Sequence, residues 1–327
     1  MELRKVQMTR GGTFFISLPK DWAGRNGIKR SSVVATSETA DGRLLIDPRY
    51  DVERVPSTTV IKPSPHLERE IIGKYLLGYD IIGIEAKDKI SLEERQKVKE
   101  TSSRLVGLEI IEEDISKIVL QCVAESSALS PEKILRREQN ISLNMHRDAV
   151  TALIDGDVHL AKNVVDRDNE VDRQYFLLVR LLRTIVQNPG LSEKLDVYPI
   201  DCLDYRLVAS LIESIADLSS QIAEYVVQLG GLRIGKDLSE RLLTLHKTVY
   251  DAHQESVISF LSRNITFAES VRGKRTEFER MYESAQLASN VHPPESAPTL
   301  LSVMSLIGRI YDQTIDISDL TMPKTER

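Results

Sequence analysis

Two pairs of carboxylates stand at helical spacing in the second half of the sequence. Asp168 and Asp172 lie within VVDRDNEVDRQYF, and Glu213 and Asp217 lie within IESIAD. In a helix, each pair lies one turn apart on one face, because residues four positions apart are neighbours. Two such pairs on neighbouring helices could share a cation, and these hard oxygen ligands suit Mg²⁺ or Ca²⁺.

The two pairs have different surroundings. Asp168 and Asp172 interrupt an apolar row that includes Phe176. Carboxylates at such positions are costly to desolvate and repel each other, so they need a cation, an arginine or raised pKa values. Glu213 and Asp217 lie in a row that an ordinary solvated face explains nearly as well. Spacing alone therefore leaves metal binding and a structural role both open.

Composition restricts the class of protein. The chain has 327 residues, of which 41% are hydrophobic and 28% charged, and this is ordinary for a globular protein of several domains. It has no apolar run long enough for a membrane span and no signal-peptide segment at its start, so we expect a cytoplasmic protein without membrane insertion. Cys122 and Cys202 stand far apart and predict neither a disulfide framework nor a zinc site.

The first fifty residues are basic, although the net charge of the chain is -6. They contain nine Lys and Arg against five Asp and Glu, which is the sign needed to bind a polyanion. Their pattern predicts strands at 3–6, 13–18, 32–36 and 44–46 and a short helix at 20–25. A unit this small buries too little surface to be stable alone, so we expect it to dimerise.

Two runs in this segment, RKVQMTRGGTFFISLPKDWAGRNGIKRSSVV and DGRLLIDP, resemble the AbrB/SpoVT-type swapped-hairpin DNA-binding domain. The resemblance covers about residues 3–48 and implies that two chains interleave hairpins and present basic residues to DNA, within a domain at 1–50. The candidate DNA-binding residues are Arg4, Lys5, Arg10, Lys20, Arg25, Lys29 and Arg30. Such residues neutralise phosphates without reading sequence, which predicts salt-sensitive binding. The same fold also serves antitoxins and dimerisation modules, and each charge could instead be solvated surface.

Residues 55–125 form a second unit in the predicted order β-α-β-α-β-β. This order suggests a small ferredoxin-like α/β sandwich. The segment has neither a Gly-rich phosphate loop nor clustered metal ligands. A structural or spacer role and a small-ligand sensor are the alternatives.

From Pro131 the chain is predicted to be helical and internally repeated. AKNVVDRDNEVDRQY from Ala161 aligns with AESVRGKRTEFERMY from Ala268, at an offset that also places His146 on His253. We therefore predict two three-helix bundles, at 131–230 and 231–327. The fold class is multidomain and mainly α.

This helical segment resembles a PhoU-type phosphate-uptake regulator from about Glu132 to the end of the chain. In that family, each three-helix repeat carries paired E/D-x-x-x-D motifs that bind clustered metal ions, so the resemblance also allows Fe or Zn. In the first repeat, Asp168, Asp172, Glu213 and Asp217 match the motif. In the second repeat, Arg275 and Gly308 replace the leading acids while Glu279 and Asp312 remain, which argues against a metal cluster there. The whole architecture is similar to that of archaeal PhoU-like regulators.

Enzymatic chemistry finds little support in the sequence. It has no Glu-x-x-His pair of a di-iron site, no nucleophile elbow, no P-loop and no dinucleotide fingerprint. His146 and His159 are within possible reach of the acidic pairs, although a lone helical histidine is more often a packed or surface residue. We therefore predict no catalytic or cofactor-binding residues.

The leading hypothesis is a homodimeric, cytoplasmic, DNA-binding transcriptional regulator of phosphate uptake that responds to phosphate or metal. The alternative is a signalling adaptor that contacts a phosphate transporter or sensor kinase and uses its N-terminal unit only to dimerise.

Overall fold

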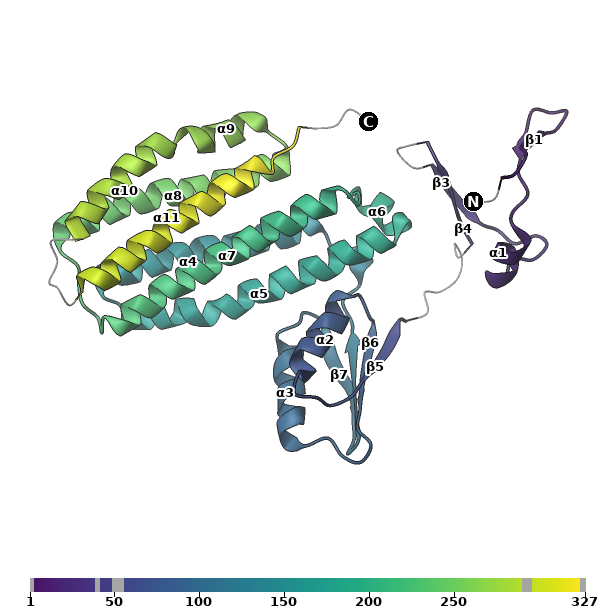
Figure 1. The fold of residues 1–327 in the computed structure, drawn as a ribbon, viewed down its shortest axis with the longest axis horizontal. Helices are drawn as coiled ribbons and strands as arrows, with labels where there is room; N and C mark the ends of the chain where they lie inside the picture. Colours follow the sequence, from purple (N-terminus) through teal and green to yellow (C-terminus); the bar gives the residue numbers. More distant parts are fainter. Residues whose placement is uncertain (1–2, 39–41, 49–55, 290–295, 324–327) are drawn as a thin grey trace. The chain divides into compact units, whose positions relative to one another are not determined.

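The computed structural model describes residues 3–38, 42–48, 56–289 and 296–323 (Figure 1). The chain divides between residues 55 and 56 into a small N-terminal unit and a large second unit. The second unit contains an α/β domain and a helical half. None of the described helices is long and apolar enough to cross a membrane.

The N-terminal unit consists of two separate antiparallel strand pairs and one short helix. Its elements are β1 (Gln7–Met8), β2 (Phe14–Phe15), α1 (Lys20–Arg25), β3 (Ala35–Glu38) and β4 (Leu44–Asp47), with β1 paired to β2 and β3 paired to β4. The first strand does not lie at 3–6 as predicted. It begins at Gln7, because the turn closed by the Thr9 and Gly12 hydrogen bonds holds only the two residues before it against β2.

No residue with described burial in the N-terminal unit is buried. Phe14 has 70% of its surface exposed, and Phe15, Val33 and Leu44 are also exposed. Apolar side chains stabilise a fold mainly by leaving water, so this unit lacks a core of its own.

The α/β domain contains four strands and two helices in the predicted order. They are β5 (Thr58–Ile61), α2 (Leu67–Leu76), β6 (Ile81–Glu85), α3 (Leu92–Ser103), β7 (Leu108–Glu113) and β8 (Lys117–Cys122). Residues four apart on α2, namely Leu67, Ile71 and Tyr75, are fully buried in one core with Ile82 of β6 and Leu120 of β8.

The ferredoxin-like assignment of this domain is wrong. The sheet order is β5-β6-β8-β7, and β5 pairs directly and in parallel with β6. In a split β-α-β fold, another strand lies between the two strands that a helix connects. Here the hairpin of β7 and β8 follows both helices, so β8 adds to the free edge of β6 instead.

The helical half contains long helices in both of the segments predicted to be repeats. The first repeat comprises α4 (Pro131–Asp155), α5 (Val158–Gln187) and α7 (Asp201–Gln228), with a short α6 (Pro189–Leu195) between the last two. The second comprises α8 (Lys236–Ser262), α9 (Ile265–Gly273), α10 (Arg275–Ser289) and α11 (Ala297–Asp319), so the counterpart of α5 is broken near Lys274. A 3₁₀ turn at Ser126–Ala128 precedes the first repeat.

The two repeats share one apolar core. Leu178 and Ile212 of the first repeat belong to the same buried cluster as Val249 and Ile307 of the second. The long helices of both repeats accordingly lie side by side in Figure 1. This shared core makes α5 and α7 rigid supports for the side chains they carry.

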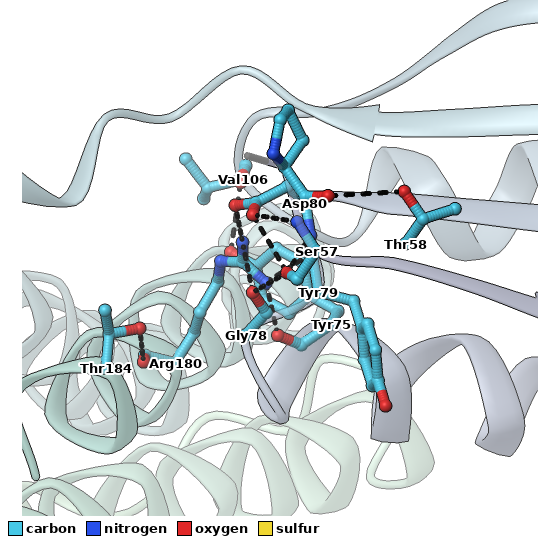
Figure 2. A network of polar contacts seen from close by, with 10 residues as sticks. Ser57, Thr58, Tyr75, Gly78, Tyr79, Asp80, Val106, Arg180 and Thr184 are labelled. Atoms are coloured by element: carbon cyan, nitrogen blue, oxygen red, sulfur yellow. Dashed lines mark hydrogen bonds and ion pairs between the residues drawn. The ribbon is translucent and has the colours of Figure 1, made fainter. Parts of the chain in front are cut away.

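Arg180 attaches the α/β domain to α5, as Figure 2 shows. Its guanidinium, on a side chain only 5% exposed, donates to the carbonyl oxygens of Tyr75 at 2.6 Å and Tyr79 at 2.9 Å. It also lies over the Tyr75 ring and 3.6 Å from an Asp80 carboxylate oxygen. The carbonyls at the end of α2 carry partial negative charge, so a buried cation is stabilised there.

Candidate functional site

The four predicted carboxylates are brought together between α5 and α7. Asp168 and Asp172 on α5, and Glu213 and Asp217 on α7, are all partly buried. Each pair lies one turn apart on its helix. Both pairs therefore occupy the partly dehydrated seam between the helices, including the α7 pair for which the sequence left a solvated face open.

The carboxylates destabilise one another's charged forms. Burial, together with the charges of Asp217 and Asp172, raises the pKa of Asp168 from 3.8 to about 6. Burial likewise raises the pKa of Glu213 from 4.5 to about 7, assisted by Asp217 and Asp172. The pKa of Asp217 is also raised, first by burial and then by Asp172. Grouped acids with raised pKa values have a strong capacity for a cation.

A fifth carboxyl, Glu138 on α4, joins this group and was missed from the sequence. Its side chain is fully buried, and among the described residues neither of its oxygens has a hydrogen-bond partner. Burial raises the pKa of Glu138 well above its ordinary value, and the charges of Glu213 and Asp172 act in the same direction. A buried polar group without a partner is uncommon in folded proteins and needs an explanation. We call Glu138, Asp168, Asp172, Glu213 and Asp217 the acid site.

Glu138 had a recognisable signal in the sequence. It occupies the buried row of α4 between Ile134 and Ser142, at a position where a packed helix normally carries an apolar side chain. Glu138 has no other acid one turn away, so a pattern of paired acids does not include it.

Two arginines lie beside the acid site. Arg104, just after α3, donates from Nη2 to Oδ2 of Asp172 at 3.2 Å and from Nη1 to Oε1 of Glu68 at 2.8 Å. Arg206 on α7 stacks over the Tyr175 ring with its guanidinium carbon 4.6 Å from the centroid. Its charge lowers the pKa values of Glu138 and Glu213, which burial raises. These arginines offset only part of the negative charge.

The five carboxyls of the acid site are the kind of ligand that a hard cation prefers, but their positions do not yet form a metal-binding site. All five groups present carboxyl oxygens, which Mg²⁺, Ca²⁺ and Mn²⁺ prefer, and Glu138 supplies two without a protein partner. Within the described part of the chain, no three His, Cys, Asp or Glu side chains stand close enough together to hold a metal ion. A cation would therefore have to draw the acid site together by side-chain rotation.

An open groove of about 430 Å³ borders the acid site. It lies between α5 and α7 and is lined by Lys162, Val165, Asp166, Glu224, Val227 and Gln228. The Glu224 charge contributes to the raised pKa of Asp168, so the groove and the acid site are electrostatically connected.

At the corresponding positions of the second repeat, an arginine side chain supplies the positive charge. Arg275 lies 3.0 Å from Glu279 and 3.4 Å from Asp312. A side chain at Gly308 would meet the Tyr282 ring, since an added Cβ would lie 3.2 Å from it. The two remaining acids of this repeat are thus already paired with an arginine of the same repeat.

The two histidines considered near the acid site have other surroundings. His146 is fully buried, and its Nε2 lies 3.4 Å from Nδ1 of His246 on α8. Burial and the neighbouring His246 lower the pKa of His146 well below its ordinary value, so this ring packs as a neutral group. His159 is exposed at the start of α5.

Six of the seven predicted DNA-binding side chains are exposed. Lys5, Arg10, Lys20, Arg25, Lys29 and Arg30 are exposed on the N-terminal unit, whereas Arg4 is half-buried and donates to the Ser17 hydroxyl at 3.3 Å. The six exposed groups are open to solvent, and Arg4 has a contact within the unit.

Comparisons with known proteins bear on the helical half. Residues 135–226 match the family model of the PhoU domain, a stretch that contains the whole acid site. Among solved structures, PhoU from Pseudomonas aeruginosa matches 58% of this chain and 93% of its own, with 20% identity and a TM-score of 0.52. The phosphate transport system regulatory protein PhoU from Streptococcus pneumoniae matches 58% of this chain and 91% of its own, with 16% identity and a TM-score of 0.49. A comparison with curated proteins finds no match.

Residues 135–226 thus resemble the PhoU domain, and the helical half has a fold similar to that of PhoU from Pseudomonas aeruginosa.

Proposed function

We propose that this protein is a homodimeric transcriptional regulator of phosphate uptake, with DNA bound by the N-terminal unit and a regulatory cation bound at the acid site. The observation that carries the proposal is the PhoU domain match, because residues 135–226 include all five carboxyls of the acid site. Among the solved structures of similar fold is PhoU from Pseudomonas aeruginosa. A regulatory rather than catalytic role in the cytoplasm follows from this reading.

The lack of a core supports dimerisation of the N-terminal unit. Phe14, Phe15 and Leu44 stay exposed within one chain, and a second copy with interleaved hairpins would bury such side chains. This agrees with the AbrB/SpoVT-type resemblance. Two copies would also double the number of exposed Lys and Arg available to DNA phosphates.

The buried, unpartnered Glu138 supports cation binding. Bound among Glu138, Asp172 and Glu213, a divalent ion would neutralise their charges. Burial and neighbouring acids raise the pKa values of Glu138 and Glu213. Asp168 and Asp217 complete the proposed set of ligands. The donors favour Mg²⁺, Ca²⁺ or Mn²⁺, and the PhoU-type resemblance adds Fe or Zn. Such an ion would supply positive charge that phosphate can also bind.

A mobility-shift assay tests DNA binding by the full-length protein. We expect a shift on fragments from the promoter of a phosphate transporter, with an affinity that falls steeply between 50 and 200 mM salt. The variant Lys29→Gln should weaken binding to all fragments and make the salt dependence shallower by about one unit. The matched variant Lys236→Gln removes an exposed lysine of α8 and should leave the shift unchanged.

The same assay separates the regulator from the adaptor. Complete absence of a shift at 50 mM salt would favour an adaptor that contacts a phosphate transporter or sensor kinase. Repeating the titration with metal and with phosphate tests whether the acid site influences DNA binding. Calorimetric titration with Mg²⁺, Mn²⁺ and Zn²⁺ then identifies the ion, and Asp168→Asn should abolish its binding.

A further inference from the structure

The carboxyl end of α3 reaches the acid site through Arg104. Its guanidinium bridges Asp172 of α5 and Glu68 of α2, at 3.2 and 2.8 Å. The neighbouring Arg173 of α5 donates to the carbonyl oxygen of Ser103. One edge of the α/β domain is therefore held directly against a carboxylate of the acid site.

A row of side chains on α5 links this contact to the Arg180 attachment. Asp168, Asp172, Phe176, Arg180 and Thr184 follow one another at intervals of four residues, so each lies about one turn from the next. Phe176 packs against the core of the α/β domain, and Arg180 binds the end of α2. The α/β domain thus has two polar attachments to α5, one at the acid site and one two turns away.

The two attachments differ in exposure. The Arg180 side chain is only 5% exposed and makes several hydrogen bonds to carbonyl oxygens, which makes it a permanent anchor. The Arg104 side chain is 37% exposed and its partner Asp172 is 21% exposed. Ion pairs in contact with water contribute little net stability, so the Arg104 contact can be exchanged for another cation.

In the second repeat, acids are also paired with an arginine, but that arginine comes from a different part of the chain. Arg275 stands at the position that corresponds to Asp168, and it pairs with Glu279 and Asp312 within its own repeat. In the first repeat, Arg104, which forms an ion pair with Asp172, comes from another domain. Only there does neutralisation of the acids depend on how a separate domain is docked.

We propose that Arg104 is a built-in competitor for the cation of the acid site, so that loading the site releases the α3 end of the α/β domain while Arg180 keeps that domain attached. A divalent ion on Asp172 repels the guanidinium and weakens its bond to the same carboxylate. By linkage, an ion that loosens the Arg104 contact must bind more tightly when that contact is removed. This inference rests on the cation site proposed above.

The test uses full-length protein, calorimetric titration with Mn²⁺, and hydrogen exchange read by mass spectrometry. In the wild type, Mn²⁺ should speed exchange in residues 100–108 at least threefold and leave residues 75–80, beside Arg180, unchanged. The variant Arg104→Gln should exchange quickly in 100–108 without Mn²⁺ and bind Mn²⁺ at least fivefold more tightly. The control Lys99→Gln removes a charge from the same helix and should behave as the wild type.

Two outcomes separate this inference from the proposed function. Binding of Mn²⁺ that Asp168→Asn removes, with unchanged exchange in 100–108 and equal affinity in Arg104→Gln, would overturn the competition and leave the cation site standing. Absence of binding to both the wild type and Arg104→Gln would overturn the cation site and the competition together.

Discussion

Replacing Glu213 with glutamine should stabilise the metal-free protein at high pH. The substitution keeps the size of the side chain but removes a charge that burial and the nearby Asp217 and Asp172 disfavour. In the folded protein, the pKa of Glu213 is raised from 4.5 to about 7. The favourable contribution of the protonated group is therefore fully present below pH 4.5 and is lost as the pH rises towards 7.

The magnitude follows from this difference in pKa. One pKa unit corresponds to about 1.4 kcal/mol, so a difference of about 2.5 gives about 3.4 kcal/mol. Glu213 is only half-buried and water screens its charge, so we reduce this by half, to about 1.7 kcal/mol. In the presence of EDTA, Glu213→Gln should exceed the wild type by this amount at pH 8 and match it at pH 4.

Urea denaturation at both pH values measures the effect, with the exposed Glu283→Gln as control. Added metal should reverse the order. A ligand at one hundred times its Kd stabilises the wild type by about 2.7 kcal/mol, and the variant gains less because it lacks one ligand. If Glu213→Gln is no more stable than the wild type at pH 8 in EDTA, the negative charge of Glu213 does not destabilise the metal-free protein, and our reasoning is refuted.

Three further predictions concern the framework. Arg180→Ala should lower the free energy of unfolding by about 3 kcal/mol in the same denaturation assay, because buried carbonyl groups lose their donor. As the control, replacement of the exposed Arg183 by alanine should change it by less than about 0.5 kcal/mol. Phe14→Asp should convert the proposed dimer to a monomer in light scattering while circular dichroism retains the helical signal. A dimer of unchanged mass would contradict the proposed role of the N-terminal unit. Gly156→Ala should lower the melting temperature by several degrees, because φ is +67° and the new Cβ would lie 2.5 Å from a carbonyl oxygen. The control Gly273→Ala, which has open space around it, should leave the melting temperature unchanged.

Helical periodicity was sufficient to find the four carboxyls of the acid site that lie in pairs. Asp168 and Asp172 were recognised because they interrupt an apolar row, and the structure places them in the seam between α5 and α7. The order of strands and helices in 56–122 was predicted correctly for the same reason, since both kinds of element have a clear hydrophobic period.

Contacts between distant segments could not be read from the sequence. The pairing of Arg104 with Asp172 joins residues 68 positions apart, and no local pattern indicates it. The sheet order of the α/β domain failed for a related reason. The same six elements permit more than one strand order, and the choice depends on which edge of β6 the last hairpin covers.

The difference between the repeats explains why only one of them retains a candidate cation site. Where the second repeat places Arg275 against its two acids, the first keeps five carboxyls and receives Arg104 from the α/β domain. An arginine on the same helix as its partner remains close to it, since its range is limited by its own side chain. An arginine on another domain can leave when that domain shifts. The first repeat is therefore the one whose charge balance can change with a ligand, and the α/β domain is the part of the molecule that would respond.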